Sequence, residues 1–166
     1  MECRLATYSD IQVIMACIHD AQALLRECDV DQWQDGYPTA EIIAEDISRG
    51  DSFVITEGND ILATAVICFS GEPTYKIIRG KWLNDEKYAV IHRLAVRKEA
   101  RGTGLAKRLF AFAEQLCSEH NIGNIRVDTH RDNAIMQQLL HSLGYTLCGE
   151  ITLTSGATRI ALHKVL

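Results

Sequence analysis

The sequence predicts a mixed α/β fold in a single domain that covers residues 1–166. Short runs rich in β-branched residues alternate with segments in which apolar residues recur every three or four positions, and these are the periods of strands and helices. No repeat, linker or low-complexity segment interrupts this alternation. The length suits one compact domain with a sizeable core.

Apolar spacing and turn signals define five elements in the first half of the chain. In order, these are a strand at Cys3–Ala6, a helix from Ser9 to about Arg26, a helix from Thr39 to Gly50, and strands at Ser52–Glu57 and Ile61–Phe69. Ser9 is the expected N-cap of the first helix, with Gln12 three residues later completing a capping box. Gly58-Asn59-Asp60 predicts a hairpin turn between the two strands.

The second half begins with a long connection, Ser70–Lys87, which we expect to be a functional or mobile loop because loops of this length are uncommon in small domains. The elements expected after it are a strand at Tyr88–Val96, a helix that begins near Gly104, a strand at Ile125–Thr129, a helix at Asn133–Leu143, and strands at Thr146–Leu153 and Thr158–Val165.

The stretch from the strand at Tyr88–Val96 to the following helix predicts an anion site. Gly102 and Gly104 stand immediately before the helix, whose first-turn N–H groups have no partner within the helix. Residues 97–108 carry a net charge of +4 in a chain of net charge −5, which leaves −9 for the rest. A basic island in an acidic protein favours a small bound anion over a nucleic-acid surface. The alternative interpretation is a solvated first turn.

Two common phosphate loops do not fit this stretch. The P-loop pattern Gly-x-x-x-x-Gly-Lys-Ser/Thr is absent, and the dinucleotide fingerprint would need a third glycine where Lys107 stands. The hexamer Arg101-Gly102-Thr103-Gly104-Leu105-Ala106 instead resembles the acetyl-CoA pyrophosphate loop of the GNAT N-acetyltransferase superfamily. Asn133 at a helix start, followed eleven residues later by a Leu-Gly-aromatic group, Leu143-Gly144-Tyr145, resembles a later motif of the same superfamily.

The resemblance covers essentially the whole chain and implies the GNAT acyl-CoA N-acyltransferase fold, a mixed central sheet with splayed strands flanked by about four helices. It implies acetyl-CoA as co-substrate. The cofactor-binding residues that it implies are Leu94, Ala95, Val96, Arg101, Gly102, Thr103, Gly104, Leu105, Ala106 and Asn133. Asn133 also suits a helix N-cap. Trp33 and Tyr37 either pack over the core or border the acceptor site, where the superfamily places its first helices.

The proton-transfer residues are less well defined by the motifs. Many relatives place a tyrosine seven residues after the asparagine to protonate the departing thiolate, but Leu140 stands there and Tyr145 is the candidate instead. His92 is the first choice for the base that deprotonates the amine, because alternation along the strand places it on the same face as Leu94. The other candidate bases are Glu57, Asp128 and His130.

The resemblance implies an N-acetyltransferase that acts on a small-molecule amine or a peptide N-terminus. The alternative is a non-catalytic acyl-CoA-binding sensor or regulatory module of the same fold. We expect no nucleic-acid or membrane partner, and a homodimer is kept open. Six scattered cysteines without a Cys-x-x-Cys pair, and a start unlike a signal peptide, predict a cytoplasmic protein without a metal site.

Overall fold

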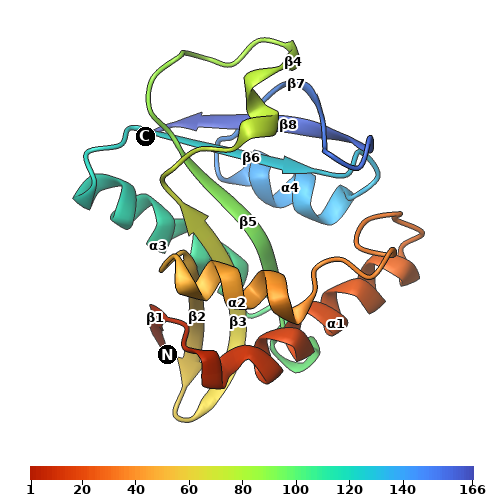
Figure 1. Ribbon diagram of the computed structural model, residues 1–166, viewed down its shortest axis with the longest axis vertical. Coiled ribbons are helices and arrows are strands. Elements are labelled where there is room, and N and C mark those ends of the chain that lie inside the picture. Colours follow the sequence, from red (N-terminus) through yellow and green to blue (C-terminus); the bar gives the residue numbers. More distant parts are fainter. The chain divides into compact units, whose positions relative to one another are not determined.

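The structure, a computed structural model, describes residues 1–166 and contains four α-helices and eight strands (Figure 1). The strands form a mixed sheet in the order β1-β2-β3-β5-β6-β8-β7-β4, which confirms the predicted fold class. The chain divides into two compact units. The first consists of Met1–Ile67 and His92–Ala113, and the second of Cys68–Ile91 and Glu114–Leu166. The single domain expected from the sequence stays a prediction, and each unit is described by itself.

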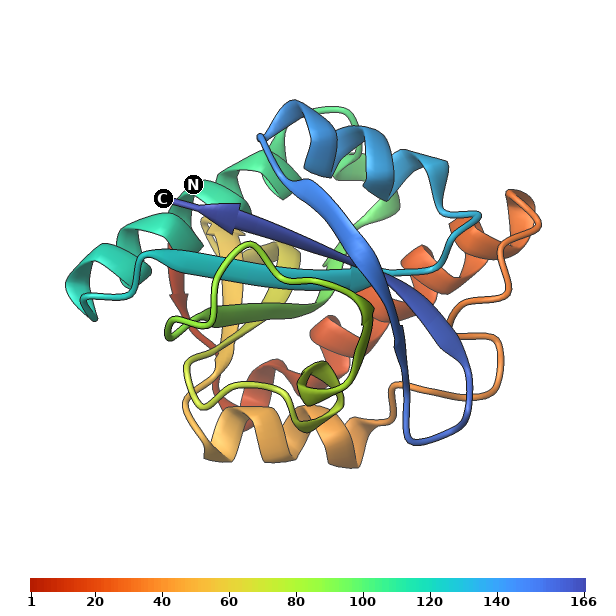
Figure 2. The same ribbon diagram turned by 90° about the horizontal axis from the view of Figure 1, so that it is seen from above.

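The first unit contains a short antiparallel sheet with helices on both of its sides. Its elements are β1 (Glu2–Leu5), α1 (Ile11–Glu27), α2 (Ala40–Ser48), β2 (Ser52–Glu57), most of β3 (Asp60–Cys68), the second part of β5 (Ala89–Val96) and the start of α3 (Leu105–Glu119). Figures 1 and 2 show α1 and α2 on one side of β2 and β3, with the first turns of α3 on the other. Apolar residues of α1, α2, β2 and β5 form its core, among them Ile14, Ile18, Ile43, Val54 and Ala95.

The start of the first helix differs from the prediction. A 3₁₀ turn, Tyr8–Asp10, precedes α1, and the capping box joins Thr7 and Asp10 rather than Ser9 and Gln12. The Asp10 carboxylate accepts from the Thr7 N–H at 2.7 Å and from the Arg4 guanidinium at 2.7 Å. The capping box therefore has Thr7 as its N-cap and Asp10 as its third residue, and Asp10 has a further, cationic partner on β1 that local spacing does not reveal.

The second unit contains β6 (Asn124–Thr129), α4 (Ala134–Ser142), β7 (Thr146–Thr152) and β8 (Thr158–Val165). β6 pairs antiparallel with β8, and β8 with β7. The first residues of β5 pair parallel with β6. In Figures 1 and 2, α4 lies on one side of β6 and β8, and the segment around residues 73–76 lies on the other.

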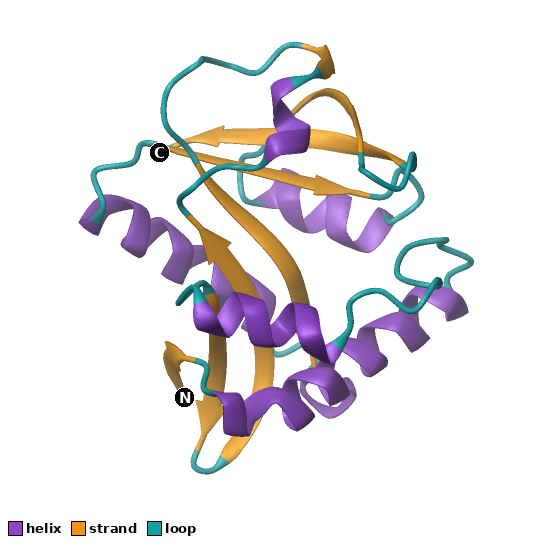
Figure 3. Ribbon diagram, in the orientation of Figure 1, coloured by secondary structure: helices purple, strands orange, loops and turns teal.

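The connection between β3 and β5, residues 69–88, contains two short elements where the sequence predicts only a long loop at Ser70–Lys87. Figure 3 shows a short helix and a strand within it, which are the 3₁₀ helix Pro73–Lys76 and β4 (Ile78–Gly80). β4 pairs with β7 and places Gly80 opposite Gly149. A β-carbon on Gly80 would lie 2.1 Å from the Cys148 carbonyl oxygen, so the two strands approach too closely for any side chain there.

All six cysteines are free thiols. Cys17 and Cys117 are buried, and burial raises the pKa of the Cys17 thiol to about 12 and that of Cys117 to about 11. Cys28, directly after α1, is exposed.

None of the four helices combines the length and the apolar character that crossing a membrane requires.

Candidate functional site

The loop between β5 and α3 has the backbone that the sequence predicted. Gly102 has φ of 78° and Gly104 has φ of 86°, in the left-handed region that glycine adopts without strain. A β-carbon built on either glycine would meet no protein atom within 4 Å. The positive φ angles therefore explain why glycine is needed for the turn, and the space beside both residues is open to a ligand.

The first turn of α3 supplies main-chain donors at this loop. The Arg108 N–H donates to the Gly104 carbonyl at 3.0 Å, which places the beginning of the helical hydrogen-bond ladder at Gly104. The N–H groups of the three residues between them consequently have no acceptor within the helix, and they carry its partial positive charge. Leu105 is 2 % exposed, so the turn is anchored in the core beneath. This arrangement suits an anion.

Asp20 of helix α1 binds residues of the loop between β5 and α3. The Asp20 carboxylate accepts from the Lys98 N–H at 3.0 Å and lies 2.9 Å from Nε of Arg97. The Arg101 guanidinium donates to the main-chain carbonyl of Asp20. Arg101 is one of the expected cofactor-binding residues. In the structure its side chain also fixes the shape of the loop.

Strand β5 departs from regular alternation at the expected active-site face. Arg93 has φ of 50°, a left-handed backbone that is uncommon for a residue other than glycine. Three successive residues, His92, Arg93 and Leu94, are half-buried, whereas Ala95 is 2 % exposed and belongs to the core. His92 and Leu94 share one face only where the alternation is unbroken, so the catalytic role of His92 stays a prediction.

All the expected cofactor residues except Asn133 belong to the first unit, as His92 does. Asn133 and Tyr145 belong to the second. Asn133 is the N-cap of α4, where its side-chain oxygen accepts from the Met136 N–H at 3.1 Å. Its N-cap role is thereby confirmed, and a cofactor contact stays a prediction.

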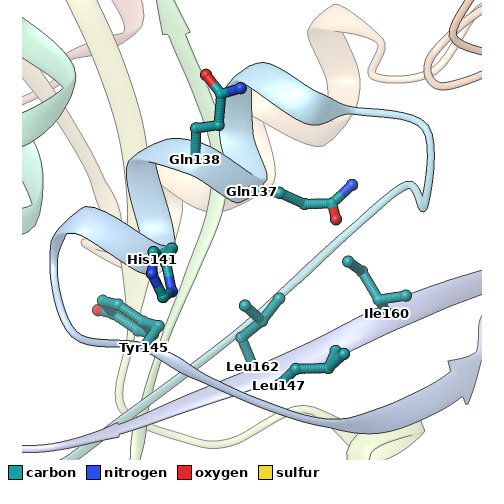
Figure 4. A pocket seen from close by; sticks show the side chains of 7 residues that line it. All are labelled: Gln137, Gln138, His141, Tyr145, Leu147, Ile160 and Leu162. Atoms are coloured by element: carbon teal, nitrogen blue, oxygen red, sulfur yellow. The ribbon is translucent and has the colours of Figure 1, made fainter.

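Tyr145 is 4 % exposed, and burial raises the pKa of its phenol. Leu140, at the position where relatives carry a tyrosine, is 1 % exposed. Tyr145 also lines a shallow pocket of about 310 Å³ beside α4, together with Gln137, Gln138, His141, Leu147, Ile160 and Leu162 (Figure 4). The raised pKa makes this buried phenol a weaker acid than an ordinary tyrosine, so the role of Tyr145 as proton donor stays a prediction.

The other candidate bases have different surroundings. Glu57 is exposed at the end of β2, and His130 Nδ1 accepts from the Asp132 N–H at 3.1 Å. Asp128 accepts a 2.7 Å hydrogen bond from the Tyr75 hydroxyl. Burial and the neighbouring Asp128 carboxylate raise the pKa of the Tyr75 phenol well above its usual value. Tyr75 lies 53 residues before Asp128, so no local pattern could predict this partner. No group of three or more His, Cys, Asp or Glu side chains could hold a metal ion.

Comparison with known proteins decides the family. The family model described as "Acetyltransferase (GNAT) family" matches residues 18–145. An acetyltransferase of the GNAT family from Streptococcus agalactiae is 36% identical, with a TM-score of 0.87 over 99% of this chain and 95% of that one. The chain belongs to the GNAT acetyltransferase family.

More distant GNAT structures share the fold. The PaiA N-acetyltransferase of Thermoplasma acidophilum, solved with coenzyme A, is 14% identical, with a TM-score of 0.71 over 99% of this chain and 98% of that one. A ribosomal-protein-alanine N-acetyltransferase from Brucella melitensis is 16% identical, with a TM-score of 0.69 over 100% of both chains. At this identity the likeness concerns the fold alone.

Proposed function

We infer that this GNAT protein is an N-acetyltransferase that moves an acetyl group from acetyl-CoA to a primary amine by direct attack on the thioester. The observation that carries the inference is the loop Arg101–Ala106, with two left-handed glycines, open space beside them and a helix N-terminus. A pyrophosphate needs several converging N–H donors and close backbone approach, and this loop offers both. The complex of the related PaiA enzyme with coenzyme A supports the choice of ligand.

In this proposal the chain mainly positions the reactants. Acetyl-CoA supplies an activated acyl group, and positioning alone can lower a barrier by roughly 7–11 kcal/mol. The main-chain N–H groups near Leu94 and Val96 would orient the cofactor and polarise the carbonyl oxygen. His92 would take the proton of the acceptor ammonium, and Tyr145 is the candidate donor to the thiolate, since Leu140 cannot donate.

The acceptor is a small-molecule amine or a peptide N-terminus. The second possibility is supported by the Brucella melitensis relative, whose name specifies a protein alanine. We also propose that the protein is cytoplasmic and acts without nucleic-acid or membrane partners.

The first test replaces Gly104 by valine. A β-branched residue at φ of 86° is strained, and its side chain occupies the space beside the loop, so coenzyme A should bind at least tenfold more weakly, about 1.4 kcal/mol. Gly156→Val is the matched control, because Gly156 has the same φ of 86° and the same open surroundings in the β7–β8 turn. Calorimetric titration with coenzyme A and thermal melts of both variants make the comparison. Equal affinity in the two variants would overturn the proposal.

The second candidate function is a non-catalytic acyl-CoA sensor, favoured by the buried Leu140 in place of a proton donor. Thiol release from acetyl-CoA with a panel of amines separates the two. Turnover on any amine supports the enzyme, whereas tight coenzyme A binding without turnover on any of them supports the sensor.

A further inference from the structure

A strained residue marks an additional feature of the first unit. Arg93 adopts φ of 50° within β5, where glycine would fit without strain. Strained backbone persists where the surrounding structure fixes it, and at such a position the side chain must contribute what glycine could not.

Two nitrogens of the Arg93 guanidinium donate hydrogen bonds to a buried carboxylate, that of Asp46. Arg93 Nε donates to Asp46 Oδ2 at 2.7 Å, and Nη2 donates to Oδ1 at 2.6 Å. The Asp46 side chain is 0% exposed and the Arg93 side chain 12%. Arg49, which is half-exposed, also donates to Oδ1 at 2.5 Å. This bidentate pair with α2 fixes the direction in which the rest of the guanidinium points.

The third nitrogen holds a tyrosine of the α1–α2 connection. Arg93 Nη1 donates to the Tyr37 hydroxyl oxygen at 2.6 Å. Gln22 Nε2 donates to the Tyr37 carbonyl at 3.0 Å, and the Tyr37 N–H donates to Asp35 at 3.2 Å. The tyrosine is therefore fixed by both its backbone and its phenol.

The phenol retains one hydrogen to donate. A tyrosine hydroxyl accepts and donates, and in this structure Tyr37 accepts from Arg93 while no protein group accepts its own hydrogen. The ring is half-buried and so can reach a ligand. An attacking amine must keep its lone pair for the thioester carbon, so an acceptor molecule bound at Tyr37 would offer the phenol another of its atoms.

We propose that Tyr37, oriented by Arg93, binds an oxygen of the acceptor, and that the acceptor is consequently an amine that carries a carboxylate or carbonyl, as amino acids and peptides do. The proposal rests on the proposed function and specifies its substrate class. A phenolic donor beside a guanidinium favours such an oxygen and disfavours a second ammonium, as in a polyamine. Arg93 acts here as a positioning residue.

The test compares amino acids with their decarboxylated amines, for example lysine with cadaverine and phenylalanine with phenethylamine, as acetyl acceptors. The parent protein should prefer the amino acid of at least one pair by tenfold or more in kcat/KM. Tyr37→Phe, which removes only the hydroxyl, should raise KM for that amino acid by about tenfold and leave KM for acetyl-CoA unchanged. Tyr8→Phe, an exposed tyrosine of the same unit, is the matched control.

Arg93→Gly separates positioning from backbone geometry. Glycine tolerates the left-handed backbone, so if only the strand bend matters, this variant should keep the parent preference. We expect it to lose the preference as Tyr37→Phe does. Because Arg93→Gly also removes the principal counter-ion of Asp46, the assays are run at a temperature at which thermal melts show the variant folded, with acetyl-CoA KM as the second folding control.

Three outcomes overturn the proposal. Decarboxylated amines could be used as well as or better than the amino acids, or Tyr37→Phe could leave the preference unchanged, and either result removes only this inference. If the parent binds coenzyme A and acetylates no amine of the panel, the proposed function fails, and the inference fails with it.

Discussion

The two units stabilise their buried polar groups in different ways. In the first unit the stabilisation comes from ion pairs. The Asp46 side chain is 0% exposed, and its carboxylate accepts from Arg49 and Arg93. In the second, a neutral chain links His163, Asn124 and Asn84. Asn124 Oδ1 accepts from Asn84 at 2.8 Å and lies 3.0 Å from His163 Nε2.

The tautomer of His163 follows from its partners. The Leu83 N–H donates to Nδ1 at 3.2 Å, so Nε2 carries the hydrogen and donates to Asn124. Burial, with a further contribution from the charge of Arg126, lowers the pKa of His163 from 6.5 to about 4. The charged pair therefore depends on both of its partners being present, whereas the neutral chain depends on the His163 imidazole remaining unprotonated at Nδ1.

Removing one member of the charged pair should have the largest effect. Asp46→Asn leaves the Arg93 guanidinium buried without its counter-ion, which we expect to lower the free energy of unfolding by about 3–5 kcal/mol. Urea unfolding at neutral pH measures this. Arg49→Met is the matched control. Arg49 contacts the same oxygen from a half-exposed position, and it should cost about 0–1 kcal/mol. Equal losses in both variants would contradict the assignment of Arg93 as the principal counter-ion.

Acidification should act on the neutral chain instead. The unfolded protein binds a proton at His163 near pH 6.5 and the folded protein only near pH 4, so the stabilisation is fully present above pH 6.5 and is lost as the pH falls to 4. The loss should be roughly 3 kcal/mol. His163→Gln should flatten the dependence of unfolding free energy on pH in this window, and the exposed His141→Gln should not. A parent protein equally stable at pH 6.5 and pH 4.5 would refute the buried neutral imidazole.

The smallest loss of stability is expected at Arg126 in the second unit, whose guanidinium lies over two aromatic rings. The Arg126 guanidinium lies 4.4 Å from the Trp82 ring centroid and 3.9 Å from that of Tyr88, and it donates to the Asn84 carbonyl at 2.7 Å. Arg126→Lys keeps the charge but loses the planar stacking, at a cost of about 0.5–2 kcal/mol. Arg79→Lys, at a side chain 89% exposed, should change stability by less than about 0.5 kcal/mol. Indistinguishable melts of the two variants would show that the rings contribute nothing.

Much of the fold could be predicted because local signals determine it. Thr39 and Asn133 cap α2 and α4 as their residue types suggest, and Gly102 and Gly104 take the left-handed angles that their position requires. The 3-residue strand β4 was missed because its pairing is decided by a non-local partner, Gly149, which leaves room for the close approach. Its own residues carry no strand period.

The site was predictable only where a motif is contiguous. The loop Arg101–Ala106 is one run of sequence, so its place before α3 could be predicted. The left-handed backbone of Arg93 could not, because arginine rarely adopts it and only the distant Asp46 and Tyr37 hold it there. For the same reason, the alternation used to orient His92 gave no warning of the irregularity one residue later.

The connection between α1 and α2 begins with an exposed cysteine, Cys28, and can therefore be labelled with a fluorescent dye. Thiol-directed dyes react with the thiolate of an accessible cysteine, and Cys28, at the start of that connection, is the exposed cysteine of the chain. Cys17 and Cys117 are buried with raised pKa values and should react last. Cys3, Cys68 and Cys148 are partly exposed, so these three would first be replaced by serine. A fluorophore on Cys28 would then lie nine residues from Tyr37 in the chain and report optically on ligands that arrive there.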